Sequence, residues 1–209
     1  MTSLKLSFQR HCYWWIGAII LLAATFYPTD LATNYATSKG GHQDALVVAV
    51  EEYGRHLNTA IPVVLAIALR DVSGMKQAAA IVVAGIVASH GPKRLLNDVE
   101  IMGTRLGERP KSPDSRHNMP SGHSTLASAG AYYTVRRYSI WLGLIVWPIL
   151  ILTMYARYML DAHTVSATIA GAITGIMVAA LFTKPRSQSG KNKRFMASDL
   201  AYQATAPAS

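Results

Sequence analysis

The stretch NMPSGHS, residues 118–124, stands at the head of an apolar run, Thr125 to Val135, and decides where a central helix begins. Pro120 restricts the residue before it to extended conformations, so a regular helix cannot start earlier. Ser121 suits the N-cap position of the helix that follows. His123 therefore falls in the first helical turn, where free backbone N–H groups and the helix dipole favour an anion.

The rest of the chain repeats this alternation of apolar runs and polar links. Hydrophobic residues make up 51% of the 209 residues and are grouped in blocks, which indicates a polytopic membrane protein. The expected apolar runs are 13–27, 57–69, 77–89, 126–135, 140–155 and 163–182. We therefore predict an all-α fold, a bundle of six transmembrane helices in one domain over residues 1–183. A basic, disordered tail over residues 184–209 is expected to follow it.

Two stretches need a specific interpretation. Residues 44–53 place Leu46, Val47 and Val50 apart from their acidic residues, which predicts a short amphipathic helix along the membrane surface. A soluble helix packed on the bundle is the alternative. The next run, 57–69, is shorter than the roughly 20 residues that a bilayer requires, so we expect it to extend into the preceding turn. Gly91-Pro92 is expected to bend the chain after the third run.

The basic residues define an orientation. The net charge of +9 raises the question of a nucleic-acid partner, but the Lys and Arg residues gather at the ends of apolar runs and leave no soluble basic face. With a cytoplasmic N-terminus, the inner side has eleven basic residues and the outer side nine, seven of which surround the candidate site described next. We predict that both termini are cytoplasmic and that the site faces outward. Cys12 is the only cysteine, which excludes an internal disulfide.

A second set of residues extends the anion site at His123. Lys93, Arg109 and Arg157 can converge on the 121–123 turn, where they would offer forked guanidinium donors and a point charge to phosphate oxygens. His123 and His163 each lie near an outer helix end. Because imidazole titrates near neutrality, one can serve as a nucleophile and the other as a general acid. No His-Glu-x-x-His pattern and no close carboxylate cluster is present, so we expect neither a metal nor a cofactor.

Together these residues resemble the three-part signature of the type 2 phosphatidic acid phosphatases. The parts are Arg109-Pro110, then Pro-Ser-Gly-His at 120–123, then Arg157 and His163 separated by five residues. The resemblance covers residues 93–182 and implies a six-helix, metal-independent membrane phosphatase. It implies that His163 attacks phosphorus and forms a phosphohistidine, while His123 protonates the leaving oxygen. The phosphate-holding groups that it implies are Arg109, Arg157, a lysine, Ser121 and Gly122.

The sequence departs from the family pattern at two positions. Met102 stands where the family has a lysine, so Lys93 takes that role if residues 94–108 contain an insertion, and Arg105 is its rival. Ala167 stands where the family has an aspartate four residues after the nucleophilic histidine. If residues 163–167 are helical, that aspartate would face His163 and fix its tautomer. Either another group orients His163, or this chain is impaired.

The substrate is expected to be a lipid of the surrounding bilayer. Arg116-His117-Asn118 and the small, basic outer loops resemble bacterial enzymes that remove the 1-phosphate of lipid A. Undecaprenyl diphosphate and phosphatidylglycerol phosphate are alternative substrates. A catalytically silent membrane protein that binds phospholipids is the alternative of another class, and Ala167 is its motivation.

Overall fold

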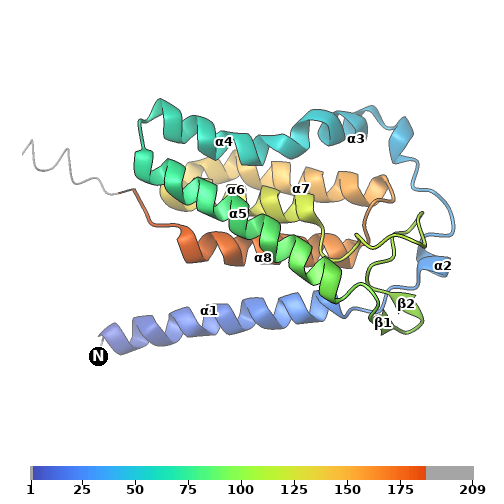
Figure 1. The fold of residues 1–209 in the computed structure, drawn as a ribbon. Helices are drawn as coiled ribbons and strands as arrows, with labels where there is room; N and C mark the ends of the chain where they lie inside the picture. Colours follow the sequence, from blue (N-terminus) through green and yellow to red (C-terminus); the bar gives the residue numbers. More distant parts are fainter. Residues whose placement is uncertain (1, 187–209) are drawn as a thin grey trace, which may run out of the picture.

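The computed structural model describes residues 2–186, including the side chains of residues 12–186. Long helices run side by side, and both described ends of the chain lie at the same end of the bundle (Figure 1). The helices are α1 (Thr2–Thr25), α2 (Leu31–Asn34), α3 (Ala45–Ala49), α4 (Arg55–Ala68), α5 (Val72–Leu95), α6 (Gly122–Arg137), α7 (Gly143–Met159) and α8 (Val165–Phe182). A small antiparallel hairpin, β1 (Glu100–Ile101) and β2 (Thr104–Arg105), lies at the opposite end.

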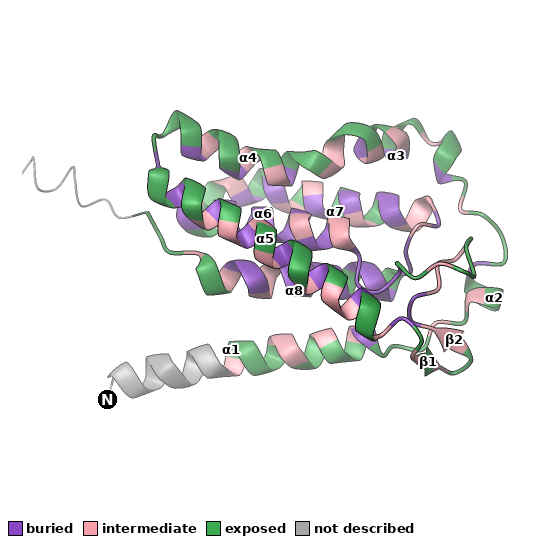
Figure 2. Cartoon of the chain, viewed as in Figure 1, coloured by how far each residue is buried: buried purple, intermediate pink, exposed green. Residues whose placement is uncertain are grey.

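Helix α6 is the centre of the bundle because its small residues allow close approach. It packs against α4, α5, α7 and α8, and most of its residues, like those of α8, are buried (Figure 2). A Cβ at Gly130 would lie 1.7 Å from the carbonyl oxygen of Asn58, and one at Gly175 would lie 2.0 Å from that of Thr125. Neither contact is compatible with a side chain, so both glycines are required where the helices touch. Helix α1 packs on α8 at the edge of the bundle.

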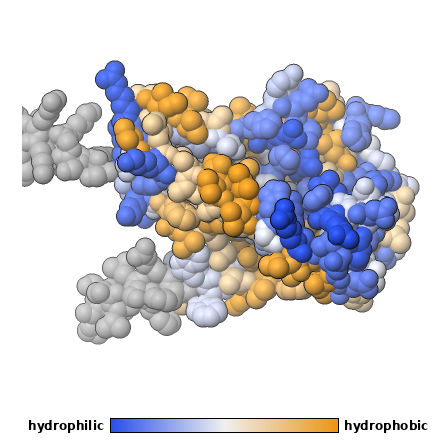
Figure 3. Space-filling view, viewed as in Figure 1, coloured by the Kyte–Doolittle hydropathy of each residue, from blue (hydrophilic) through white to orange (hydrophobic). Residues whose placement is uncertain are grey.

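The outer surface is suited to a bilayer. An apolar band crosses the middle of the molecule, and hydrophilic residues lie at both ends (Figure 3). Within the described part of the chain, three helices are long and apolar enough to cross a membrane, namely Val72–Leu95, Ile140–Met159 and Val165–Phe182, while the apolar part of α1 is the shorter stretch Cys12–Thr25. The predicted all-α membrane fold is thus confirmed, and the count of six spans remains a prediction.

The chain between residues 44 and 68 differs from the expected surface helix. Helix α3 continues through a π-helical turn, Val50–Gly54, directly into α4, so the segment is the first part of a longer helix. Val47 and Val50 are buried against Ala156 of α7, because the apolar face of this segment has a partner in the bundle. The segment therefore packs on the bundle and, as expected, extends the short apolar run 57–69.

Helix α5 continues through Pro92 to Leu95, so Lys93 lies in its last turn. An expectation about the start of α8 was wrong. His163 is not in α8, because Thr164 is the N-cap residue and its side chain accepts a hydrogen bond from the N–H of Ala167. Residues 163 and 167 are therefore not one helical turn apart on a shared face.

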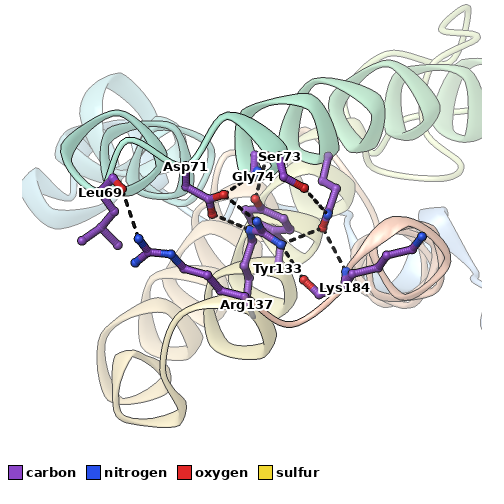
Figure 4. Close-up of polar contacts among 9 residues, drawn as sticks. Leu69, Asp71, Ser73, Gly74, Tyr133, Arg137 and Lys184 are labelled. Atoms are coloured by element: carbon purple, nitrogen blue, oxygen red, sulfur yellow. Dashed lines mark hydrogen bonds and ion pairs between the residues drawn. The ribbon is translucent and has the colours of Figure 1, made fainter. Parts of the chain in front are cut away.

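The end of the bundle that holds both described chain ends is closed by a buried ion pair (Figure 4). Arg137 donates from Nε and Nη2 to the carboxylate of Asp71 at 2.7 and 2.6 Å, and from Nη1 to the carbonyl of Lys184 at 2.6 Å. Asp71 also caps α5 through the N–H of Gly74. The predicted disordered tail thus has an ordered beginning at residues 184–186. Residues 187–209 lie outside the described part of the chain.

Candidate functional site

The start of α6 is fixed from two sides, which gives the predicted anion site a rigid backbone. The Ser121 side chain accepts from the N–H of Ser124, so the predicted N-cap is confirmed. The Ser121 N–H donates to the carbonyl of Ala167 at 2.9 Å, which ties α6 to the first turn of α8. A Cβ at Gly171 would come within 2.4 Å of the Ser121 carbonyl, so this approach requires glycine there.

Three cationic side chains surround this helix start. Lys93 reaches it from α5, and its Nζ lies 3.8 Å from where a Cβ of Gly122 would be. Arg157 comes from α7 and is buried, whereas Arg109 comes from the loop and is half-buried. Burial, and then the charge of Arg157, lowers the pKa of Arg109.

The two arginines have buried donors with no partner. Among the described residues, the Nε atoms of Arg109 and Arg157 are buried and make no hydrogen bond. Their other contacts leave that edge free, because Arg157 donates to Glu51 from Nη1 at 2.6 Å and Arg109 donates to the His117 carbonyl from Nη2 at 3.5 Å. An unpaired buried donor is costly, so an acceptor placed at either Nε would be favourable. Phosphate oxygens match such guanidinium edges.

Glu51 is a member of this site that the sequence analysis missed. It lies in the π-helical turn, where the extra backbone residue changes the direction of side chains. Its Oε1 accepts from both Arg157 and Arg55. Only the folded position of residues 45–54 against α7 brings the carboxylate to Arg157, about one hundred residues away in the sequence. The carboxylate holds the guanidinium of Arg157 in one orientation.

His163 is buried and has a defined ring orientation. Its Nδ1 lies 2.8 Å from the carbonyl oxygen of Asn118, an acceptor only, so Nδ1 carries the proton and Nε2 carries the lone pair. The Asn118 side chain fixes the residue after His163. Its Oδ1 accepts from the Thr164 N–H at 3.1 Å, and its Nδ2 donates to the Thr164 hydroxyl at 3.3 Å. Asn118 thus provides the orienting contact that Ala167 cannot make.

The surroundings of His163 favour its neutral form. Burial is the largest cause, followed by the charges of Arg157, Arg109 and Lys93, and together they hold the pKa of His163 well below its ordinary value. A neutral imidazole with a free Nε2 is a competent nucleophile, whereas imidazolium is not. His123 lies in the first turn of α6, as predicted, and is partly exposed.

The two departures from the family pattern have structural explanations. Met102 is at the tip of the β1–β2 hairpin and is 85% exposed, and this hairpin lies between Lys93 and Arg109 in the sequence. Arg105 lies in β2 and donates to the Pro113 carbonyl, a contact within the hairpin region. Lys93, rather than Arg105, joins the arginines. Ala167 is fully buried, with Leu106, Met119 and Ala170 around it.

No group of three or more histidine, cysteine, aspartate or glutamate side chains that could bind a metal ion is found among the residues that the structure describes.

Comparisons with known proteins agree with this geometry. The model of the PAP2 superfamily matches residues 59–190. A lipid A 1-phosphatase of Helicobacter pylori strain J99 is 40% identical over 137 residues, which are 66% of this chain and 71% of that protein. A lipid A 1-phosphatase of H. pylori strain 26695 is 38% identical over 136 residues, 65% of this chain and 70% of that protein. No solved structure matches the chain. The match over more than half of the chain confirms the resemblance found in its three motifs: this membrane protein belongs to the PAP2 superfamily.

Proposed function

We propose that the protein is a lipid A 1-phosphatase of a bacterial inner membrane that works without a metal. The observation that carries the proposal is the pair of buried, unpartnered Nε atoms of Arg109 and Arg157, beside a neutral His163. Together with Lys93 and the N–H groups at the start of α6, these arginines form what we call the phosphate cradle. The cradle selects a dianionic phosphate and presents it to a nitrogen nucleophile. The specific lipid is inferred from the two relatives, whose names give lipid A as their substrate.

The proposed reaction has two displacement steps. Nε2 of His163 attacks phosphorus, and the bond from phosphorus to the glycosidic oxygen breaks as His123 gives that oxygen a proton. His123, now neutral, takes a proton from a water molecule, which attacks the phosphohistidine and releases inorganic phosphate and His163. Arg109, Arg157, Lys93 and the N–H groups at the start of α6 stabilise the charge on the phosphoryl oxygens in both steps.

The proposed topology has six crossings, made by α1, α3–α4, α5, α6, α7 and α8. The backbone of residues 45–68 is helical throughout, which makes the α3–α4 segment long enough to cross at 1.5 Å per residue, or about 36 Å. Both described chain ends lie at the end opposite the candidate site. The distribution of basic residues assigns that end to the cytoplasm and the site to the periplasm.

The alternative of a catalytically silent binding protein rested on Ala167. The contact between His163 Nδ1 and the Asn118 carbonyl weakens that reason, because the imidazole has an orienting acceptor. Undecaprenyl diphosphate and phosphatidylglycerol phosphate remain alternative substrates for the same cradle, since each carries a terminal phosphate.

The test is phosphate release by the purified full chain in mixed micelles, from lipid A and the two alternative lipids. We expect lipid A to lose its 1-phosphate, in the presence of EDTA as in its absence, and His163→Ala to abolish the reaction. Mass spectrometry of the product identifies the position from which phosphate is lost. No turnover of lipid A, or activity that vanishes with EDTA and returns with a divalent ion, contradicts the proposal.

A further inference from the structure

A groove outside the phosphate site lies between α1 and the first turns of α8. Its volume is about 610 Å³, within the range of small-molecule sites. Its deeper part is lined by Ile20 and Ala23 of α1 and by Ile169 of α8. Tyr27, which follows α1, and Val165 at the start of α8 line the groove toward the polar end of the bundle. The groove therefore begins among apolar side chains and runs toward the polar end of the bundle.

A fixed cation stands at the polar mouth of this groove. Lys39 donates from Nζ to the carbonyl of Asn34 at 2.9 Å, and Nζ lies 5.3 and 5.5 Å from the ring centres of Tyr35 and Tyr158. These contacts hold the ammonium group in place. No ion pair found in the described part of the chain includes Lys39, so no carboxylate neutralises its ammonium charge. This charge complements an anionic group placed at the mouth of the groove.

Residues at the mouth of the groove form hydrogen bonds with residues that precede and follow His163 in the sequence. On the following side, the Tyr35 hydroxyl accepts from the Val165 N–H at 3.2 Å. On the preceding side, Asp161 Oδ2 accepts from the Ser38 hydroxyl at 2.8 Å and from the Lys39 N–H at 3.3 Å. Asp161 has a left-handed backbone, with φ of 52°, which these bonds help to maintain. The same segment thus forms the groove and clamps the link that holds the nucleophile.

The groove is distinct from the phosphate cradle. The cradle residues come from α5, α6, α7 and the 109 loop, and none of them lines the groove. The first turn of α8 separates the two, with Val165 and Ser166 facing the groove. A long apolar channel with a cation at its interfacial end matches an amphiphile with a negative headgroup.

We propose that this groove binds one acyl chain of an anionic phospholipid of the bilayer, with the headgroup at Lys39. Occupancy braces α1 against α8 and, through Tyr35 and Asp161, stabilises the link that presents His163. The binding site stands independently of the reaction, whereas the effect on turnover rests on the proposed phosphatase function. Phosphatidylglycerol is a suitable probe, because its phosphodiester has no terminal phosphate for the cradle to remove.

The test uses the purified full chain in detergent with phosphatidylglycerol or phosphatidylcholine, each carrying the same photoreactive acyl chain. We expect crosslinks within residues 20–27 and 165–169, at least fivefold stronger for phosphatidylglycerol. Ala23→Trp fills the groove and should reduce both signals at least fivefold, while Leu22→Trp, an exposed neighbour that does not line it, is the control. Lys39→Gln should lower the phosphatidylglycerol signal to that of phosphatidylcholine, and Lys111→Gln should not.

Several results would overturn the site. They are equal labelling by the two lipids, unchanged labelling of Ala23→Trp, or displacement of the probe by lipid A, which would assign the groove to a substrate chain. In the same micelles, phosphatidylglycerol should raise turnover severalfold in the parent protein and in Leu22→Trp but not in Ala23→Trp. Selective labelling by phosphatidylglycerol without a gain in turnover refutes only the coupling between the groove and turnover. Selective labelling of a protein that hydrolyses none of the three candidate lipids refutes only the proposed function.

Discussion

Asn118→Ala is the most informative substitution, because it separates the side chain of Asn118 from the carbonyl that orients His163. Alanine keeps the backbone acceptor 2.8 Å from Nδ1 but removes both side-chain bonds to Thr164, at 3.1 and 3.3 Å. The loop at 118 is then no longer fixed against the residue that follows the nucleophile. We expect His163 to lose its alignment while the phosphate-binding cations stay in place.

The magnitude follows from these bonds. Each net hydrogen bond contributes about 1 kcal/mol, and an unsatisfied buried N–H, here that of Thr164, costs a further 1–3 kcal/mol, roughly. If about 2 kcal/mol of this total is lost from the transition state, kcat falls about 30-fold. KM should change by less than about threefold, since the missing contacts act on the nucleophile rather than on ground-state binding.

The assay is initial-rate phosphate release from lipid A micelles, with kcat and KM determined separately. Asn97→Ala is the matched control, because Asn97 and Asn118 are both 4% exposed and Asn97 bonds to Asp98 instead of a site residue. The control should lose stability in a thermal melt but keep kcat. An Asn118→Ala protein that turns over at the parent rate would refute the assigned role of Asn118.

Ala167→Asp tests the same account from the opposite side. The aspartate would occupy a fully buried position among apolar side chains, where an added carboxylate is poorly solvated, and Nδ1 of His163 already has an acceptor. We expect no gain in kcat and a lower melting temperature. A tenfold or greater rise in kcat would instead mean that His163 is poorly oriented in the parent chain.

Four further predictions concern the rest of the molecule. Glu51→Ala removes the acceptor of Arg157 and should lower kcat/KM about tenfold, because part of a charge-assisted hydrogen bond of roughly 1.5–3 kcal/mol acts in catalysis. The control Glu52→Ala changes an exposed neighbour and should leave kcat/KM unchanged. A rise in kcat/KM of Glu51→Ala would mean that Glu51 competes with phosphate for Arg157. Because the pKa of His163 is depressed, its imidazole should stay neutral as the pH falls below the ordinary histidine pKa of about 6.5 and should become protonated only at a lower pH. An NMR titration of labelled His163 measures this. A titration midpoint at or above about 6.5 would contradict the expectation. Arg137→Ala leaves Asp71 buried and unpaired and should cost about 3–5 kcal/mol of unfolding free energy, whereas exposed Arg136→Ala should leave the melting temperature within a few degrees of the parent. In a Cys12→Ser background, an impermeant thiol reagent added to spheroplasts should label Ser112→Cys but not Ser73→Cys, and the reverse pattern would invert the proposed topology.

The sequence by itself predicted the membrane class, the family and most residues of the candidate phosphate site. Apolar runs of bilayer length require helices, because backbone groups in lipid must be satisfied within the segment. The residues Pro120, Ser121 and Gly122 define a helix start through local backbone chemistry, which does not depend on distant parts of the chain. The resemblance then indicated Arg109, Arg157 and the two histidines. Lys93 was predicted with Arg105 as its rival, and the structure brings Lys93 to the start of α6.

Only the tertiary structure decided how His163 and Arg157 are held. The orienting group for His163 is a backbone carbonyl, which every residue possesses and no sequence pattern can single out. The acceptor for Arg157 is Glu51, whose direction depends on a π-helical turn and on packing against α7. The predicted role for position 167 failed for a related reason, since the N-cap at Thr164 excludes His163 from the helix. Contacts between segments 45 to 106 residues apart are set by the relative placement of helices, and that placement follows from packing of the whole bundle.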